Sequence, residues 1–140
     1  MYYLDTSVLV ALYLPEPGSP KAQMFCAGPE PAAISALTEV EFHSALSRRA
    51  RAGELSRDDA LKVVSNFKVH LDDRLYQITP VAPRDYALAR DWLGTFRTPL
   101  RTLDAIHLAV TFSNGFIVVT ADRILAESAR HFGVKHKLIS

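Results

Sequence analysis

The sequence predicts a single α/β domain over residues 1–140, built on a central parallel sheet of four to five strands that is flanked by helices. Short apolar runs typical of strands alternate along the chain with longer segments of helical period, which is the order found in βαβ units. In addition, a chain of 140 residues, of which 49% are hydrophobic, can bury a core of its own without disulfides.

The first elements follow from signals that lie close together in the sequence. An apolar run at residues 2–4 predicts a buried strand that stops at Asp5. Asp5 and the two hydroxyl residues after it supply N-cap chemistry for a helix to residue 12, which the prolines of residues 15–20 end. A short helix at 22–26 and a second strand at 32–35 are expected next.

The remaining elements continue the alternation. A long helix at 37–51 ends in basic residues before Gly53, a composition that helix C-termini favour. The run at 116–120 is the clearest strand, because it is continuous and rich in β-branched residues. The other expected elements are helices at 56–71, 84–96, 103–112 and 122–132, a strand at 75–79 and an edge strand at 137–139.

Composition and charge exclude several classes of protein. The 16 basic and 15 acidic residues give a net charge of +1, so any binding of nucleic acid must come from local patches. Cys26 is the only cysteine, which excludes an internal disulfide and suits a reducing compartment. No apolar run approaches the roughly 20 residues that span a bilayer, and no basic region precedes the first apolar residues. We therefore expect a cytoplasmic protein without a membrane segment or signal peptide.

Four carboxylates fall where predicted strands end or predicted helices begin. Asp5 ends the first strand, and Asp122 lies just past the strand that ends at Thr120. Asp104 lies in the first turn of an apolar helix, and Glu41 lies in the first turns of the helix after the second strand. Because ligands bind outside the carboxyl ends of parallel strands, these four acids could converge on one edge of the sheet.

Each of these acids also has a purely structural interpretation. Asp5 and Asp122 can be plain N-caps. Asp104 can instead pair with a helix dipole, and Glu41 can be a solvated helix residue. The apolar surroundings of Asp5 and Asp104 favour a site, since a carboxylate there needs a compensating charge and no Lys or Arg is adjacent to Asp5. Oxygen ligands suit Mg²⁺ or Mn²⁺, whereas the five histidines and the single cysteine have no zinc spacing.

Four short motifs occur in order along the chain. They are Tyr2-Tyr3-Leu4-Asp5-Thr6-Ser7, Ser35-x-x-Thr38-x-x-Glu41, Leu103-Asp104-Ala105-Ile106-His107-Leu108-Ala109 and Thr120-Ala121-Asp122. Together they resemble the motifs of PIN domains and, within that superfamily, of VapC-type toxins of bacterial toxin–antitoxin pairs. The resemblance implies a set of catalytic and metal-binding acids with hydroxyl side chains beside them: Asp5, Glu41, Asp104 and Asp122, with Thr6, Ser7 and Thr120. The family spacing from Ser35 selects Glu41 over Glu39, which lies about 200° away around the helix.

The resemblance further implies an activity. It indicates a Mg²⁺-dependent endoribonuclease, with Mn²⁺ as a possible substitute, that hydrolyses RNA phosphodiesters with metal-activated water and acts as a toxin. Its expected partners are an RNA substrate, a cognate antitoxin that covers the acidic cleft, and a second copy of the chain in a homodimer. Two alternatives are a catalytically silent PIN module that binds RNA or protein, and a nuclease of the same fold that matures RNA. Four intact acids argue against silence.

Several other side chains can be either structural or functional. His107, three residues after Asp104, is expected to pack beside the site rather than act in it. Two basic clusters can be solvated helix ends or contacts to RNA phosphates: Arg48, Arg49 and Arg51, and Arg97 with Arg101. Three aromatic residues are expected in the core or at a dimer contact rather than under stacked bases: Tyr86, Trp92 and Phe96.

Overall fold

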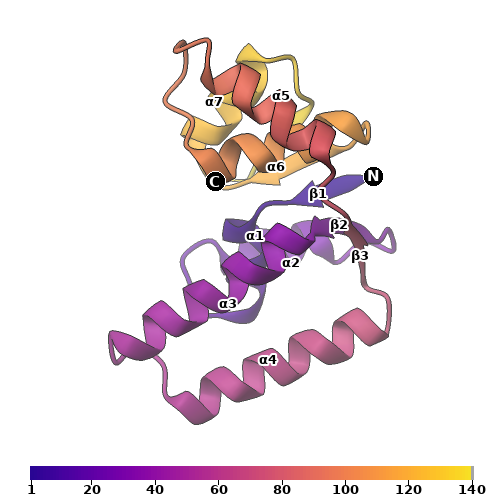
Figure 1. Cartoon of the computed structure of the whole chain (residues 1–140). Helices are drawn as coiled ribbons and strands as arrows, with labels where there is room; N and C mark the ends of the chain where they lie inside the picture. The colour runs from indigo at the N-terminus through magenta and orange to yellow at the C-terminus, as the bar shows by residue number, and fades with distance from the viewer. Residues whose placement is uncertain (140) are drawn as a thin grey trace.

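Five parallel strands form one sheet through the centre of the molecule. The structure is a computed structural model that describes residues 1–139, shown as a ribbon in Figure 1. The strands of these residues are β1 (Tyr2–Leu4), β2 (Ala32–Ser35), β3 (Tyr76–Thr79), β4 (Ile117–Thr120) and β5 (His136–Leu138). Their order across the sheet is β3-β2-β1-β4-β5, and every neighbouring pair is parallel. This confirms the predicted α/β fold, with β1 at the centre and β5 at one edge.

The described residues form seven helices, which lie on the two sides of this sheet. They are α1 (Thr6–Tyr13), α2 (Ser19–Cys26), α3 (Ala36–Arg51), α4 (Arg57–Asp72), α5 (Pro83–Leu93), α6 (Thr102–Ser113) and α7 (Arg123–His131). Helices α1 to α4 lie on one side and α5 to α7 on the other, as Figure 1 shows. Within residues 1–139, no helix is both long and apolar enough to span a membrane.

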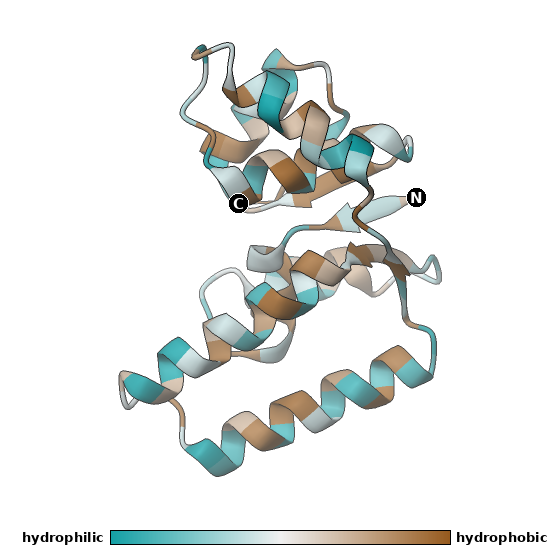
Figure 2. Ribbon diagram, viewed as in Figure 1, coloured by the Kyte–Doolittle hydropathy of each residue, from teal (hydrophilic) through white to brown (hydrophobic). Residues whose placement is uncertain are grey.

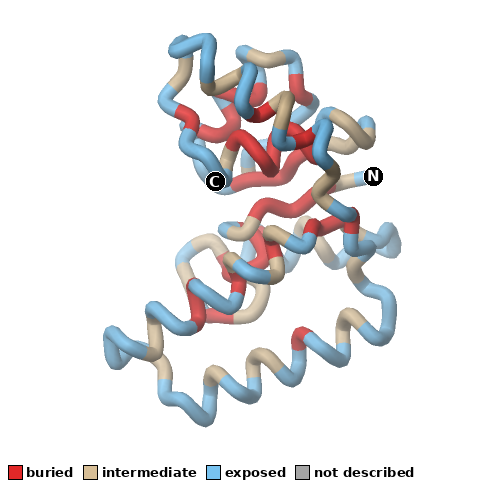
Figure 3. Tube along the Cα trace, in the orientation of Figure 1, coloured by how far each residue is buried: buried red, intermediate tan, exposed pale blue. Residues whose placement is uncertain are grey.

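The strands contribute to two separate hydrophobic cores. Tyr3 and Val118 pack with buried residues of α6 and α7, whereas Leu4 and Val119 pack with buried residues of α1 and α3. Figure 2 shows hydrophobic residues on the strands and on the helix faces turned toward them, and Figure 3 shows the same segments as buried. Because the central strands are buried on both faces, they are continuous apolar runs in the sequence.

Three helices begin directly after a strand, and each has a side-chain cap. Asp5 caps α1 by accepting a hydrogen bond from the Val8 N–H at 3.0 Å, and Ser35 caps α3. Asp122 caps α7 just past the end of β4. Since parallel strands end at the same edge of a sheet, these caps bring three polar side chains and three helix N-termini to the carboxyl edge.

Most element boundaries lie within one residue of the prediction, and two differ by three residues. Helix α5 ends at Leu93 rather than at residue 96, because Gly94 forms its C-cap and Phe96 adopts a left-handed φ of 55°. Phe96 therefore lies in a loop. Helix α2 begins at Ser19 rather than at residue 22, because the Ser19 hydroxyl donates a hydrogen bond to the Leu14 carbonyl at 2.9 Å and fixes the chain there.

Candidate active site

The four acids singled out in the sequence line one cleft at the carboxyl edge of the sheet. The cleft has a volume of about 440 Å³. Asp5 lies between β1 and α1, Glu41 on α3, Asp104 in the first turn of α6 and Asp122 between β4 and α7. Four segments that are far apart in the sequence therefore place a carboxylate in the same cleft.

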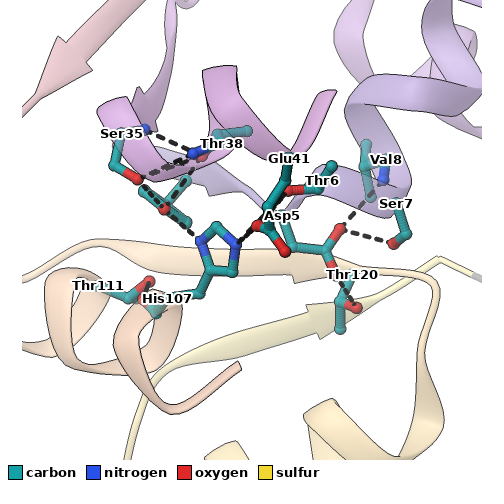
Figure 4. Close-up of polar contacts among 11 residues, drawn as sticks. Asp5, Thr6, Ser7, Val8, Ser35, Thr38, Glu41, His107, Thr111 and Thr120 are labelled. Atoms are coloured by element: carbon teal, nitrogen blue, oxygen red, sulfur yellow. Dashed lines mark hydrogen bonds and ion pairs between the residues drawn. The ribbon is translucent and has the colours of Figure 1, made fainter. Parts of the chain in front are cut away.

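Asp5 is buried and held by three hydrogen bonds. Its Oδ1 accepts from the Ser7 hydroxyl at 2.7 Å and from the Val8 N–H at 3.0 Å, and its Oδ2 accepts from the Thr120 hydroxyl at 2.5 Å (Figure 4). Only 5% of the residue is exposed, although it lines the cleft. Burial raises the pKa of Asp5, although the hydrogen bonds from Thr120, Ser7 and Val8 act to lower it. The carboxylate thus lacks full compensation for its charge.

Thr120 links two of the acids. Its hydroxyl donates to Asp5, and its oxygen accepts a hydrogen bond from the Asp122 N–H at 3.0 Å. The Asp122 carboxylate is exposed and accepts at Oδ1 from the Ile124 N–H at 2.8 Å. Thr120 is fully buried behind Asp5, so it acts on the cleft through these two contacts rather than by lining it.

Glu41 is bound by two neighbours through one oxygen. The Thr6 hydroxyl donates to its Oε1 at 2.7 Å, and Nε2 of His107 forms a short contact with the same oxygen (Figure 4). Burial alone would raise the pKa of Glu41, but the hydrogen bond and charge of His107, with the bond from Thr6, lower it below its usual range. Glu41 lines the cleft, whereas Glu39 does not.

The pKa of Asp104 is raised, whereas that of Glu41 is lowered. Burial raises the pKa of Asp104, the charge of His107 lowers it, and the charges of the three other acids raise it further. The carboxylate lies at the N-terminal turn of α6, where the helix dipole favours a negative charge. The acids therefore lie close enough to repel one another, and Asp104 is one of those that experience the repulsion.

A buried hydrogen-bonded network behind Glu41 was not foreseen in the sequence. His107 is 2% exposed, and its Nδ1 lies 2.6 Å from the Tyr3 hydroxyl. That hydroxyl also contacts Ser35 Oγ at 2.8 Å and Thr38 Oγ1 at 3.2 Å. His107 packs beside the site as expected, and in addition it binds one of the acids directly. The available signal was its position one helical turn after Asp104, on the same face.

The basic side chains of the cleft come from the C-terminal half of α3. Arg48 and Arg49 both line it. Arg49 forms an ion pair with Glu16, which also lines the cleft, whereas Arg48 is exposed and forms no ion pair within residues 1–139. The other basic residues singled out in the sequence lie outside the cleft lining: Arg51, Arg97 and Arg101.

The donor chemistry of the cleft fits a divalent ion. In the part of the chain that the structure describes, no Lys or Arg forms an ion pair with Asp5, Asp104 or Asp122, so basic side chains do not neutralise these acids. Mg²⁺ and Mn²⁺ prefer such oxygen ligands. Among the same residues, no three His, Cys, Asp or Glu side chains lie close enough together to hold one ion as they stand. The charge and the ligand type therefore fit, but no complete set of three ligands is preformed.

A comparison with protein families identifies the fold. The family model of the PIN domain matches residues 2–130. The chain belongs to the PIN domain family. No curated protein matches the chain in sequence.

Solved structures share this PIN fold over nearly the whole chain. VapC20 of Mycobacterium tuberculosis, described as a toxin that cleaves the sarcin–ricin loop, is 18% identical with a TM-score of 0.73, over 91% of this chain and 95% of that one. VapBC2 of Rickettsia felis, bound to a DNA fragment from its promoter, is 16% identical with a TM-score of 0.72, over 99% of this chain and 98% of that one. FitAcB of Neisseria gonorrhoeae is 19% identical with a TM-score of 0.70, over 97% of this chain and 96% of that one. At these identities the similarity shows the fold.

Proposed function

We propose that this PIN domain is a divalent-metal-dependent endoribonuclease and the toxin of a toxin–antitoxin pair. The observation that carries the proposal is the cleft itself, in which four carboxylates converge and three have no basic partner within the described residues. Bare acids repel an RNA phosphodiester, and a bound cation reverses that local charge. The similar fold of VapC20, described as a toxin that cleaves the sarcin–ricin loop, supports the proposal of a cleaving toxin.

The residues of the cleft have distinct roles in this proposal. An ion held by Asp5, Asp104 and Asp122, with Glu41, would lower the pKa of a bound water and stabilise charge on the phosphodiester. Thr120 fixes the Asp5 carboxylate and the start of α7 at once, and Thr6 and Ser7 each hold one acid by a hydroxyl hydrogen bond.

Arg48 is our candidate for binding the RNA backbone. It lines the acidic cleft from α3 and is exposed. Arg49, one residue away, is already paired with Glu16, so it offers less charge to a ligand. A contact of Arg48 with a phosphate adds affinity without reading the base sequence.

We propose an antitoxin as the partner that controls the cleft. A basic side chain from such a partner could pair with the acids and displace the ion, and this charge-assisted pair gains strength where water is excluded. Solved neighbours include VapBC and FitAB assemblies, whose names pair two components, and this supports a two-protein system. An excess of antitoxin should then abolish cleavage.

A homodimer is the second proposed assembly. Aromatic side chains lie exposed on the α5–α7 side of the sheet: Phe96 is 92% exposed, Tyr86 56% and Phe112 51%. Trp92 stacks on Phe132, with ring centroids 4.9 Å apart, and contacts Phe112 edge to face at 5.8 Å. Exposed apolar surface of this kind marks an interaction site more often than an ordinary surface does.

Cleavage of RNA by the purified chain tests the central proposal. The wild type should cut RNA with Mg²⁺ or Mn²⁺ and stop cutting in EDTA, while Asp5→Asn, prepared in parallel, should not cut. Wild-type protein that binds RNA but never cleaves it would support a silent binding module instead. Induction in cells tests the toxin role, because a toxin arrests growth and a cognate antitoxin relieves the arrest. Cleavage of precursor RNA without growth arrest would favour an RNA-maturation nuclease.

A further inference from the structure

We propose that Tyr3 and His107 are positioning residues that fix the orientation of the Glu41 carboxylate in the cleft. The inference rests on the proposed role of Glu41 as one of the acids that serve a divalent ion. It assigns a function to two buried side chains that do not themselves reach the substrate. Tyr3 is 0% exposed and His107 2% exposed, so both act from behind the cleft.

Both ring nitrogens of His107 have a defined partner. Nε2 contacts Glu41 Oε1 (Figure 4), and Nδ1 lies 2.6 Å from the Tyr3 hydroxyl. The Tyr3 ring is tilted by 56° to the imidazole, with ring centroids 5.6 Å apart. An imidazole that is bonded at both nitrogens cannot rotate without breaking at least one of these contacts.

The direction of hydrogen bonding follows from the chemistry of the partners. An ionised Glu41 can only accept, so His107 must donate from Nε2. In a neutral imidazole Nδ1 then accepts from the Tyr3 hydroxyl, and in a charged imidazole Nδ1 donates to the Tyr3 oxygen, so Tyr3 can serve as a partner in either form. The Tyr3 oxygen in turn can accept from the hydroxyls of Ser35 and Thr38, at 2.8 and 3.2 Å. The Glu41 carboxylate therefore selects the His107 tautomer, and the Tyr3 hydroxyl, which can donate or accept, holds the ring in place at Nδ1.

This arrangement fixes one oxygen of Glu41 and leaves the other without a protein donor. Thr6 and His107 both bind Oε1, and within the described residues no hydrogen bond reaches Oε2. A carboxylate held at one oxygen keeps its plane while the second oxygen can bind a cation. Partners behind a metal ligand commonly work in this way, and their loss costs about 10- to 100-fold in metal affinity or activity.

Tyr3→Phe is the direct test, because it removes the hydroxyl and keeps the buried ring. Ser35 and Thr38 still contact each other, at 3.3 Å, so the start of α3 keeps its cap. We expect Mn²⁺ affinity, measured on the RNA-free protein by calorimetry, to fall about 10-fold or more while circular dichroism stays unchanged. An affinity within twofold of wild type in a folded variant would overturn the proposal.

A second tyrosine–histidine pair supplies a matched control. The Tyr13 hydroxyl lies 2.6 Å from Nδ1 of His70, with the same chemistry, but neither residue lines the cleft. Tyr13→Phe should leave Mn²⁺ affinity within twofold of wild type. If both variants lowered the affinity equally, the effect of Tyr3→Phe would reflect general destabilisation and the positioning role would be rejected.

Nitrogen NMR of the His107 ring gives a readout that a merely structural role would not move. We expect Nε2 to carry a proton in the wild type, and Tyr3→Phe to shift the Nδ1 signal, because Nδ1 loses its hydrogen-bond partner while Nε2 keeps Glu41. A proton on Nδ1 alone in the wild type would refute the assignment. In addition, Tyr3→Phe combined with His107→Ala should bind Mn²⁺ no more weakly than His107→Ala alone, because Tyr3 acts through His107; additive losses would reject this coupling.

The failure of this inference can be told apart from failure of the proposed function. If the wild type neither bound Mn²⁺ nor cleaved RNA, the proposed function would fall. The positioning of Glu41 would still be tested by NMR, since Glu41→Gln should move the His107 ring signals. Unchanged signals in that variant would overturn the contact itself.

Discussion

Replacement of Asp5 by Asn separates the proposed catalytic role of this side chain from its structural one. The carboxylate makes three hydrogen bonds, two at Oδ1 and one at Oδ2. An Asn side chain has nearly the same shape and can place its oxygen at the Oδ1 position, where the Ser7 hydroxyl and the Val8 N–H still find an acceptor. Its NH₂ group then faces the Thr120 oxygen, which has a lone pair available to accept from it.

The expected cost in stability is small. A hydrogen bond to a charged group contributes about 1.5–3 kcal/mol and a neutral one about 1 kcal/mol, so loss of the charge weakens the network. The same change removes a buried charge, and burial already raises the pKa of Asp5 in spite of its three hydrogen bonds. These effects oppose each other, so we expect the free energy of unfolding to change by no more than about 1 kcal/mol, or roughly 2–4 °C in Tm.

The expected cost in activity is large. Loss of a residue behind a metal ligand already costs about 10- to 100-fold, so loss of a charged ligand should cost more than about 100-fold in RNA cleavage. Melting by circular dichroism and cleavage of a labelled RNA with Mg²⁺ measure the two effects. Asp5→Ala is the control, because it also removes the N-cap of α1 and should lose about a further 1 kcal/mol. Near-wild-type cleavage by a folded Asp5→Asn protein would refute the assignment of Asp5.

The half-buried Asp104, the exposed Arg48 and the exposed Phe96 ring can each be tested by one substitution. Because the pKa of Asp104 is raised in the fold, its carboxyl favours folding at low pH and this contribution is lost as pH rises through the raised pKa. Asp104→Asn should therefore raise the Tm of the metal-free protein at pH 7, with the gain fading toward pH 4, and should reduce the rise in Tm that Mg²⁺ produces. Arg48→Ala should weaken RNA binding and reduce the salt dependence of binding by about one phosphate contact. Arg51 lies outside the cleft lining, so Arg51→Ala should change neither. Binding titrations at several salt concentrations measure both variants. Light scattering should give twice 15.5 kDa for the wild type and a smaller species for Phe96→Asp, and a wild-type monomer at micromolar concentration would reject the dimer.

The sequence predicts the elements well, because the strands of this fold are buried on both faces and are bounded by strong signals. The run at 116–120 and the N-caps at Asp5 and Asp122 place the strand–helix junctions within a residue or two. The errors lie at boundaries where the backbone adopts a conformation that periodicity does not report. Phe96 continues the apolar spacing of α5, but its left-handed φ takes it out of the helix.

The candidate site is predicted less completely. The acids can be found from the sequence because each occupies a position that topology brings to the same edge of the sheet. The contacts between them cannot, since they depend on side chains separated by up to 115 residues, as Thr120 and Asp5 are. Nothing in the sequence indicates a role for the Tyr3 hydroxyl, because an aromatic residue in a buried strand indicates only packing. Its hydroxyl gains a role only once His107 is known to lie against it.

The acids of the cleft are electrostatically unequal, and this inequality indicates what the cleft requires. Glu41 has a lowered pKa because His107 and Thr6 compensate its charge from within the protein. Asp5 and Asp104 have raised pKa values, because burial outweighs the compensation that they receive. Under the proposed function, a cation would therefore be stabilised most by those two acids, while Thr6 and His107 already orient Glu41. The fold stabilises one acid and leaves two under-compensated, so the proposed ion would supply the compensation that these two lack.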